Sequence, residues 1–160
     1  MHNILLSGFV AMQLLLQCCG SDRDNQYIDR EMVPELTEAK AWMGLSEIES
    51  DVGFVEGYKN NNTAVAACRV FHNDTRRPVV TVIRSWWHRV DRDTRVYILI
   101  HELGHCEWKL GHTDNERDIM YPYYNYPAYL WKYADSAKRT YMIFEMHKAP
   151  SIYSTKGGNG

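Results

Sequence analysis

The sequence lacks the excess of basic residues that a nucleic-acid-binding protein carries. Its 160 residues have a formal net charge of −2 and an isoelectric point near 6.4, so no basic field is available to attract a polyanion. It also lacks internal repeats, a glycine-rich phosphate loop, and any serine or cysteine in the pattern of a catalytic nucleophile. These absences argue against nucleic-acid binding, solenoid or propeller architectures, and nucleophilic catalysis.

The apolar run at the N-terminus is too short to span a bilayer. Residues 4–16 form a run of about thirteen residues, against the roughly twenty that a spanning helix needs, and this is typical of an export signal. Cys18 and Cys19 directly follow the run, in a segment similar to a bacterial lipobox, where a cysteine is acylated. Either cysteine could be the lipidated residue, and an ordinary cleaved signal is the alternative.

We therefore expect residues 1–20 to be an export signal and residues 21–33 to be a tether. The protein is expected to be exported and lipid-anchored to a bacterial membrane, or otherwise secreted. Beyond the leader only two cysteines remain, Cys68 and Cys106. An oxidising compartment permits a disulfide between them, while two buried thiols are an equally open interpretation.

The composition beyond the leader is that of one folded domain. Aromatic residues make up 12% of the chain, with eleven tyrosines, which is too many for a disordered protein. We expect an α+β domain over residues 34–150 and a disordered tail at residues 151–160. Periodicity and turn residues predict helices at residues 34–45, 92–110 and 128–148, and strands at residues 51–58, 63–71 and 78–87.

Two apolar stripes are predicted to bury the longer helices in the core. Asp91 is the expected N-cap of the helix at residues 92–110, whose stripe is Val96, Leu99, Ile100 and Leu103. The helix at residues 128–148 carries a seam of Leu130, Ala134, Ala137, Tyr141 and Phe144. The strand at residues 78–87 has apolar residues on both faces, so it is expected to be central or covered.

The segment HELGHCEWKLGH, residues 101–112, carries the chemistry. His101 and His105 are four residues apart, so on a helix both imidazoles project from one face and reach a single metal ion. Glu102 points to the side, where it can act on water without ligating the ion. His112 is the natural third ligand of a site that keeps one position open, and Gly111 is expected to take the positive φ that ends the helix.

Asp114 is the alternative third ligand, since carboxylate oxygen also suits zinc, and Glu107 and Glu116 are weaker candidates. The competing interpretation is a helix that carries histidines without a metal.

The motif resembles that of the metzincin metallopeptidases, and within them the matrixin-like branch. Their pattern is HExxHxxGxxH followed by a methionine turn, and residues 101, 102 and 105 match it, as does the turn Met120-Tyr121-Pro122. Trp108 stands at the family's glycine position and Gly111 at its third histidine position, so His112 is one residue late. Small bacterial metallopeptidases with HELGHC and this later spacing are similar over about residues 64–125.

The resemblance implies a small mixed β-sheet packed on an active-site helix, a methionine turn and a C-terminal helix. It implies one Zn²⁺ per chain, Glu102 as general base, and Met120 as a hydrophobic floor beneath the metal. Tyr123 and Tyr124 are expected to stabilise an oxyanion or to wall a specificity pocket. By analogy with the family, the strand at residues 78–87 is expected to expose an edge that pairs with substrate.

The expected function is therefore that of a zinc-dependent endopeptidase acting on a peptide or protein substrate. The alternative is a non-catalytic, zinc-stabilised exported lipoprotein that acts as a binding or surface module. Glu102 favours the enzyme, because a purely structural zinc site has no use for a general base. The residues leave the substrate and the oligomeric state open.

Overall fold

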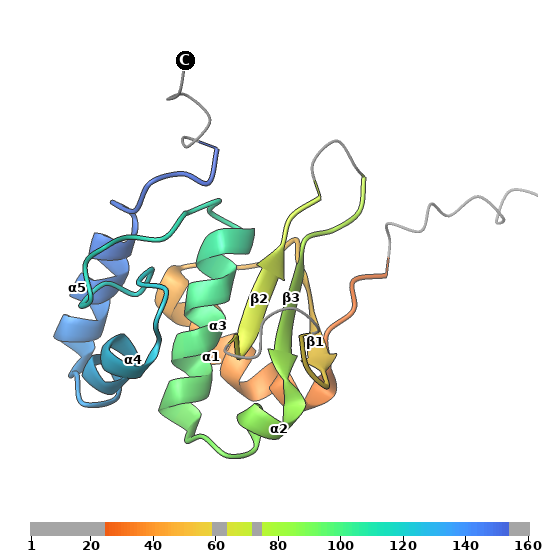
Figure 1. Cartoon of the computed structure of the whole chain (residues 1–160), viewed down its shortest axis with the longest axis horizontal. Coiled ribbons are helices and arrows are strands. Elements are labelled where there is room, and N and C mark those ends of the chain that lie inside the picture. The colour runs from red at the N-terminus through yellow and green to blue at the C-terminus, as the bar shows by residue number, and fades with distance from the viewer. Residues whose placement is uncertain (1–24, 59–63, 72–74, 154–160) are drawn as a thin grey trace, which may run out of the picture.

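A computed structural model describes residues 25–58, 64–71 and 75–153 of the chain (Figure 1). It confirms the α+β class, with a three-stranded mixed sheet lying against helices. The elements are, in chain order, η1 (Arg30–Met32), α1 (Val33–Met43), β1 (Asp51–Val55), β2 (Ala66–Arg69), β3 (Val79–Ile83), α2 (Arg84–Trp87), α3 (Arg92–Cys106), α4 (Asn125–Lys132) and α5 (Ser136–Met146).

The expected export signal and its two cysteines, Cys18 and Cys19, lie outside the described residues. Among residues 25–58, 64–71 and 75–153, no helix is long and apolar enough to cross a membrane.

The sheet has the strand order β1-β3-β2, with β1 parallel and β2 antiparallel to β3. The prediction that β3 is central is confirmed, and Val80 and Val82 are fully buried. The strand was predicted to continue to residue 87, but it ends at Ile83. Residues 84–87 form α2, which buries Trp86 and Trp87. The expectation that this strand offers an open edge is also wrong. β2 forms that edge of the sheet, beside α3.

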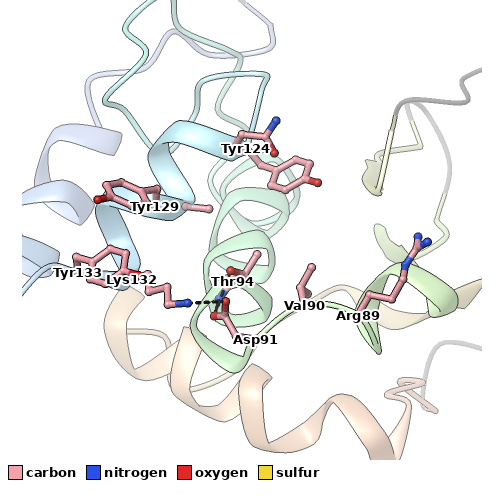
Figure 2. A pocket seen from close by; sticks show the side chains of 10 residues that line it. Arg89, Val90, Asp91, Thr94, Tyr124, Tyr129, Lys132 and Tyr133 are labelled. Carbon is pink, nitrogen blue, oxygen red and sulfur yellow. Dashed lines mark hydrogen bonds and ion pairs between the residues drawn. The ribbon is translucent and has the colours of Figure 1, made fainter.

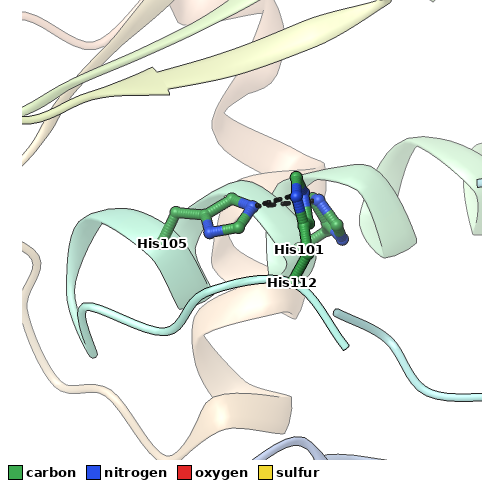
Figure 3. A group of neighbouring side chains, drawn as sticks. All are labelled: His101, His105 and His112. Atoms are coloured by element: carbon green, nitrogen blue, oxygen red, sulfur yellow. Dashed lines mark hydrogen bonds between the residues drawn. The ribbon is translucent and has the colours of Figure 1, made fainter. Parts of the chain in front are cut away.

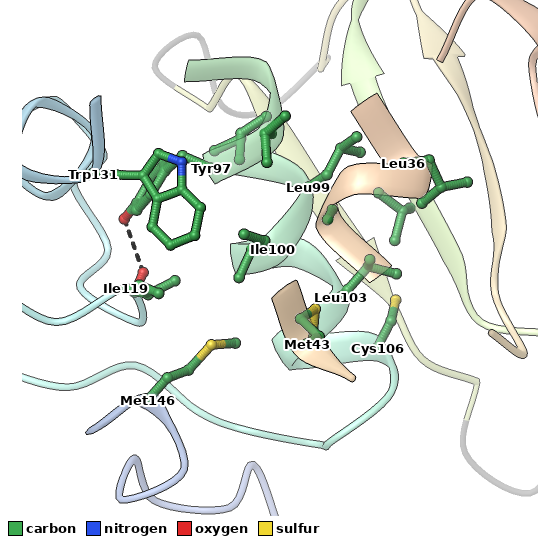
Figure 4. Packing of buried hydrophobic residues seen from close by; sticks show 14 of the residues in the cluster. Leu36, Met43, Tyr97, Leu99, Ile100, Leu103, Cys106, Ile119, Trp131 and Met146 are labelled. Carbon is green, nitrogen blue, oxygen red and sulfur yellow. Dashed lines mark hydrogen bonds between the residues drawn. The ribbon is translucent and has the colours of Figure 1, made fainter. Parts of the chain in front are cut away.

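Helix α3 runs through the middle of the domain, between the sheet, α1 and α4 (Figures 1 and 4). Asp91 caps it as predicted, accepting a hydrogen bond from the Thr94 backbone N–H at 3.1 Å. The predicted stripe is confirmed, since its four side chains are completely buried: Val96, Leu99, Ile100 and Leu103. The helix ends at Cys106, four residues before the predicted end at residue 110.

The single helix predicted at residues 128–148 is two helices, α4 and α5. Asp135 starts the second one by capping the Lys138 N–H at 2.8 Å, and this polar cap breaks the continuous seam. The buried face of α5 consists of Met142, Ile143 and Met146. Tyr141 and Phe144, predicted to be core residues, are 60% and 61% exposed. The break rotates α5 so that a different stripe meets the core.

The packed domain extends beyond the predicted limits of residues 34 and 150. At its start, Ile28 forms a bridge with Val52, and Met32 is completely buried, so residues 28–32 are not a free tether. At its end, Ser151 pairs with Leu110. Residues 154–160 of the predicted tail lie outside the described residues.

Candidate metal centre and cleft

Three histidines converge at the C-terminal end of α3 (Figure 3). The Nε2 atom of His105 lies 3.2 Å from Nε2 of His101 and 3.2 Å from Nε2 of His112. One ligand atom from each residue lies within 4.8 Å of the others, so the group could hold one metal ion. The predicted pair on one helical face and the predicted third histidine therefore come together.

Backbone carbonyls orient two of these rings. The carbonyl of Ile119 lies 2.6 Å from Nδ1 of His101, and the carbonyl of Leu110 lies 2.6 Å from Nδ1 of His105. Because a carbonyl only accepts, Nδ1 carries the proton in each neutral ring and Nε2 carries the lone pair. This is the arrangement that holds a metal-ligating histidine in place.

The facing lone pairs fit a cation. With both Nδ1 atoms protonated, no proton remains on Nε2 of His101 or His105 to join those atoms, although they are 3.2 Å apart. Tetrahedral zinc with Zn–N bonds of about 2.0–2.1 Å holds two ligand nitrogens roughly 3.3–3.4 Å apart. The donor set and the two spacings of 3.2 Å from Nε2 of His105 are therefore compatible with a zinc ion.

Burial keeps the imidazoles neutral. It lowers the pKa of His101 to about 3, and the neighbouring His105 lowers that pKa further, while the Ile119 carbonyl opposes the shift. Burial likewise lowers the pKa of His105 to about 4, against the effect of its bond to Leu110. The pKa of His112 is also lowered by burial. Neutral rings are the form that binds metal.

A tight loop after α3 delivers the third histidine. The residue in the left-handed conformation is Lys109, at φ 56°, whereas the predicted Gly111 does not take a positive φ. The Lys109 ammonium donates to the Cys106 carbonyl and so caps the end of α3. Gly111 is needed for another reason, since a Cβ there would lie 3.1 Å from the Pro150 carbonyl oxygen. The chain turns at residue 109 and brings His112 back to the helix.

The alternative ligands do not join the group. Asp114 and Glu116 are exposed in the loop beyond it, and neither belongs to the metal-binding cluster found among residues 25–58, 64–71 and 75–153. Glu107 points elsewhere, because its carboxylate accepts hydrogen bonds from the backbone N–H groups of Glu49 and Ser50. His112 is therefore the third ligand that the geometry supports.

Glu102 is a buried carboxyl group that lines the cleft beside the histidines. Burial raises its pKa to about 8, and a hydrogen bond from the backbone N–H of Cys68 opposes that rise. Cys68 is on β2, so one bond links the edge of the sheet to the acidic residue of the motif. The arrangement places an ionisable carboxyl group in the same cleft as the histidine group, and this carboxyl group is not one of the candidate ligands.

The segment at residues 118–121 forms a turn under α3. The Tyr121 N–H donates to the Asp118 carbonyl at 3.2 Å, and the Met120 N–H donates to the Asp118 carboxylate at 2.8 Å. Met120 is completely buried, and its sulfur would lie 2.8 Å from a Cβ added at Gly104. Met120 therefore packs against the turn of α3 that carries both histidines, and a side chain at residue 104 would displace it.

A cleft of about 900 Å³ runs between β2 and the segment at residues 121–125, with the histidines and Glu102 at its base. Tyr123 and Tyr124 both line it, as the sequence predicted for pocket residues. Tyr123 is 69% exposed, whereas the Tyr124 hydroxyl accepts a hydrogen bond from the Trp86 indole at 3.1 Å. Tyr124 is thus held in place by a hydrogen bond, whereas Tyr123 is exposed and contacts the Tyr121 ring edge-on.

A smaller hollow of about 350 Å³ lies between α4 and the start of α3 (Figure 2). It shares Tyr124 with the cleft, and Lys132 and Asp91 form an ion pair of 3.1 Å within it.

A disulfide joins Cys68 and Cys106, whose Cα atoms are 5.7 Å apart. It ties β2 to the last residue of α3. Of the two interpretations that the sequence left open, the structure has the bridge and not two buried thiols. The disulfide therefore holds β2, which borders the cleft, against α3. It also holds the Cys68 N–H near the Glu102 carboxyl group.

Sequence reasoning missed three contributors to the site. The carbonyls of Ile119 and Leu110 give no side-chain signal and could not be found from residue types. Tyr97 was open to prediction, since it precedes His101 by four residues and so lies on the same helical face. Its hydroxyl donates to the Ile119 carbonyl at 2.9 Å (Figure 4), and burial raises its pKa well above the usual value.

None of the protein-family models, curated proteins or solved structures compared with the chain matches it.

Proposed function

We propose that the protein is a zinc-dependent endopeptidase of the metzincin type. The observation that carries this proposal is the convergence of three Nε2 atoms beside a buried carboxyl group that faces an open cleft. A structural zinc site has four protein ligands, whereas a hydrolytic site has three. Within the described part of the chain, the cluster has three.

The residues would divide the work as follows. His101, His105 and His112 would hold the zinc, which when bound supplies an acidified water and a Lewis acid for the scissile carbonyl. Glu102 would accept a proton at its carboxylate and later pass it to the leaving amine. Met120 would support the helix beneath the ligands. The roles of His101, Glu102, His105 and Met120 follow the resemblance residue by residue, whereas that of His112 is supported by its position in the histidine group.

The open edge of β2 suits an extended peptide. The Val65 carbonyl accepts from the Ile83 N–H on β3, so the alternate residues Ala66 and Cys68 direct their backbone groups away from β3. This direction agrees with the bond from the Cys68 N–H to Glu102. A substrate strand added at this edge would lie along the cleft and gain main-chain hydrogen bonds at Ala66, since the Cys68 N–H is already bonded to Glu102.

The test compares full-length wild-type protein with Glu102→Gln, and uses Glu116→Gln as the matched control on the exposed loop. We expect one zinc per chain in all three proteins. Cleavage of an unfolded protein should be lost only in Glu102→Gln, by about 10²-fold or more. Zinc binding without cleavage by wild type would favour the non-catalytic lipoprotein. Absence of zinc binding would refute the metal site.

A further inference from the structure

A second hollow, of about 500 Å³, meets the cleft at the metal centre. Both are lined by Cys68, His105 and His112, so the histidine group stands between them. The rest of the wall of this hollow comes from Val70 after β2, from Gly111 in the loop that carries His112, and from Pro150, Ser151 and Ile152 of the C-terminal segment. The site therefore offers a separate space on each side of the metal-binding group.

The C-terminal strap, defined here as residues 149–152, is fixed to the loop that carries His112. The Gly111 N–H donates to the Pro150 carbonyl at 2.5 Å, and the Ile152 N–H donates to the Lys109 carbonyl at 2.8 Å. Ala149 is buried, which anchors the strap to the end of α5. These bonds make the strap a rigid wall beside the ligand.

The side chains that line this wall are largely uncharged. Among residues 25–58, 64–71 and 75–153, the lining residues other than the two histidines are uncharged, and Ser151 is the one that carries a side-chain hydroxyl. The Cγ2 atom of Ile152 lies 3.8 Å from the position of a Cβ at Gly111, so the isoleucine side chain borders the hollow next to His112. An unpaired charge is costly to desolvate there, whereas a hydrocarbon side chain gains from burial.

The order of residues along β2 indicates which side of the scissile bond the hollow would receive. Residues 64–67 line the large cleft, Cys68 lines both spaces, and Val70 lines only the hollow. A substrate paired antiparallel to β2, the more stable pairing, would enter at Val70 and leave at residue 64. Its residues N-terminal to the scissile bond would then face the hollow.

We propose that the strap forms a subsite for an apolar side chain N-terminal to the scissile bond, with Ile152 as its specificity-determining residue. This inference rests on the proposed endopeptidase function. It predicts cleavage after uncharged, apolar residues, because the described part of the wall offers the Ile152 and Val70 side chains and no counter-charge.

Cleavage profiles test whether the hollow receives the residue N-terminal to the scissile bond and whether Ile152 determines its specificity. Peptide mixtures are digested with wild type, Ile152→Asp, Ile152→Trp and, as control, Tyr141→Ala, an exposed residue of α5 that lines neither space. Zinc content is measured for each. We expect Ile152→Asp to lower cleavage after leucine-like residues about 10-fold or more, and Ile152→Trp to reject large residues while keeping small ones. An unchanged profile, or a change confined to residues C-terminal to the bond, overturns the proposal.

Binding gives a second readout that needs no turnover. The Ile152 methyl NMR signal is followed in zinc-loaded Glu102→Gln protein during addition of acetyl-leucine amide or acetyl-aspartate amide. We expect the signal to move with the leucine probe alone. If wild type cleaves nothing yet this signal moves, the hollow binds apolar side chains, but the peptidase proposal and the assignment of the hollow as a substrate subsite both fail. If wild type cleaves and the signal does not move, the subsite is refuted and the peptidase stands.

Discussion

Reduction of the Cys68–Cys106 disulfide should remove about 4 kcal/mol from the free energy of unfolding. The bridge closes a loop with a sequence separation of 38 residues, and chain entropy lost from the unfolded state scales with the logarithm of that length, which gives roughly 4 kcal/mol at 25 °C. With a urea m-value of about 2 kcal/mol per molar, the unfolding midpoint should fall by about 2 M. Urea titration of the oxidised and reduced protein measures this shift.

Both titrations are performed in a metal chelator, so that the released thiols cannot bind an ion. The control is the variant Cys68→Ala/Cys106→Ala, which keeps Cys18 and Cys19 and whose midpoint should not respond to the reductant. A shift of less than about 1 kcal/mol in the wild type would refute the assignment of the bridge as a major constraint on the unfolded chain.

The same reduction should impair cleavage more than it impairs zinc binding. The three histidines lie on α3 and the loop after it, whereas the bond to Glu102 comes from Cys68 on β2. Releasing β2 from α3 therefore loosens the cleft wall and the partner of Glu102, and leaves the ligands in place. Equal losses of zinc affinity and cleavage would contradict this division.

Three further changes probe the metal centre. His112→Ala should weaken zinc binding by more than the roughly 10–100-fold that loss of an outer-shell partner costs, while Asp114→Ala should leave the affinity unchanged, both by calorimetric titration. Tyr97→Phe removes the hydroxyl that bonds to the Ile119 carbonyl and should cost about 1 kcal/mol of stability and up to roughly 10-fold in zinc affinity; no change in either would remove Tyr97 from the site. Lys109→Val forces a β-branched residue to φ 56°, and Lys109→Asn tolerates this conformation, while both lose the bond to the Cys106 carbonyl. Lys109→Val should therefore be about 1–2 kcal/mol less stable in urea than Lys109→Asn.

Local patterns in the sequence were sufficient for α3 and for its ligands. The cap at Asp91 and the four buried residues of the stripe depend on neighbours within the same helix, so spacing alone predicts them. His101 and His105 share a face for the same reason. These features needed no knowledge of where the remaining elements pack.

The errors arose where tertiary packing decides the outcome. The periodicity from residue 130 to residue 144 is continuous, yet the Asp135 cap divides it, and packing against the core selects Met142 and Met146 instead. Strand order has no local signal, so β3 was given the open edge that belongs to β2. Backbone carbonyls that orient the histidines have no residue-type signature at all.

The extra residue between His105 and His112 moves the turn without altering the spacing that follows it. In the metzincin pattern the glycine precedes the third histidine by three residues, and here the left-handed residue Lys109 precedes His112 by three. The additional residue thus falls between His105 and the turn, where α3 has already ended at Cys106 and the Lys109 ammonium caps the helix. The number of residues between the turn at Lys109 and His112 is what matters for the geometry, because this short segment must bring the imidazole back over α3. Counted from the turn, His112 has the same three-residue separation as the third histidine of the metzincin pattern. With this separation, its Nε2 atom lies 3.2 Å from Nε2 of His105.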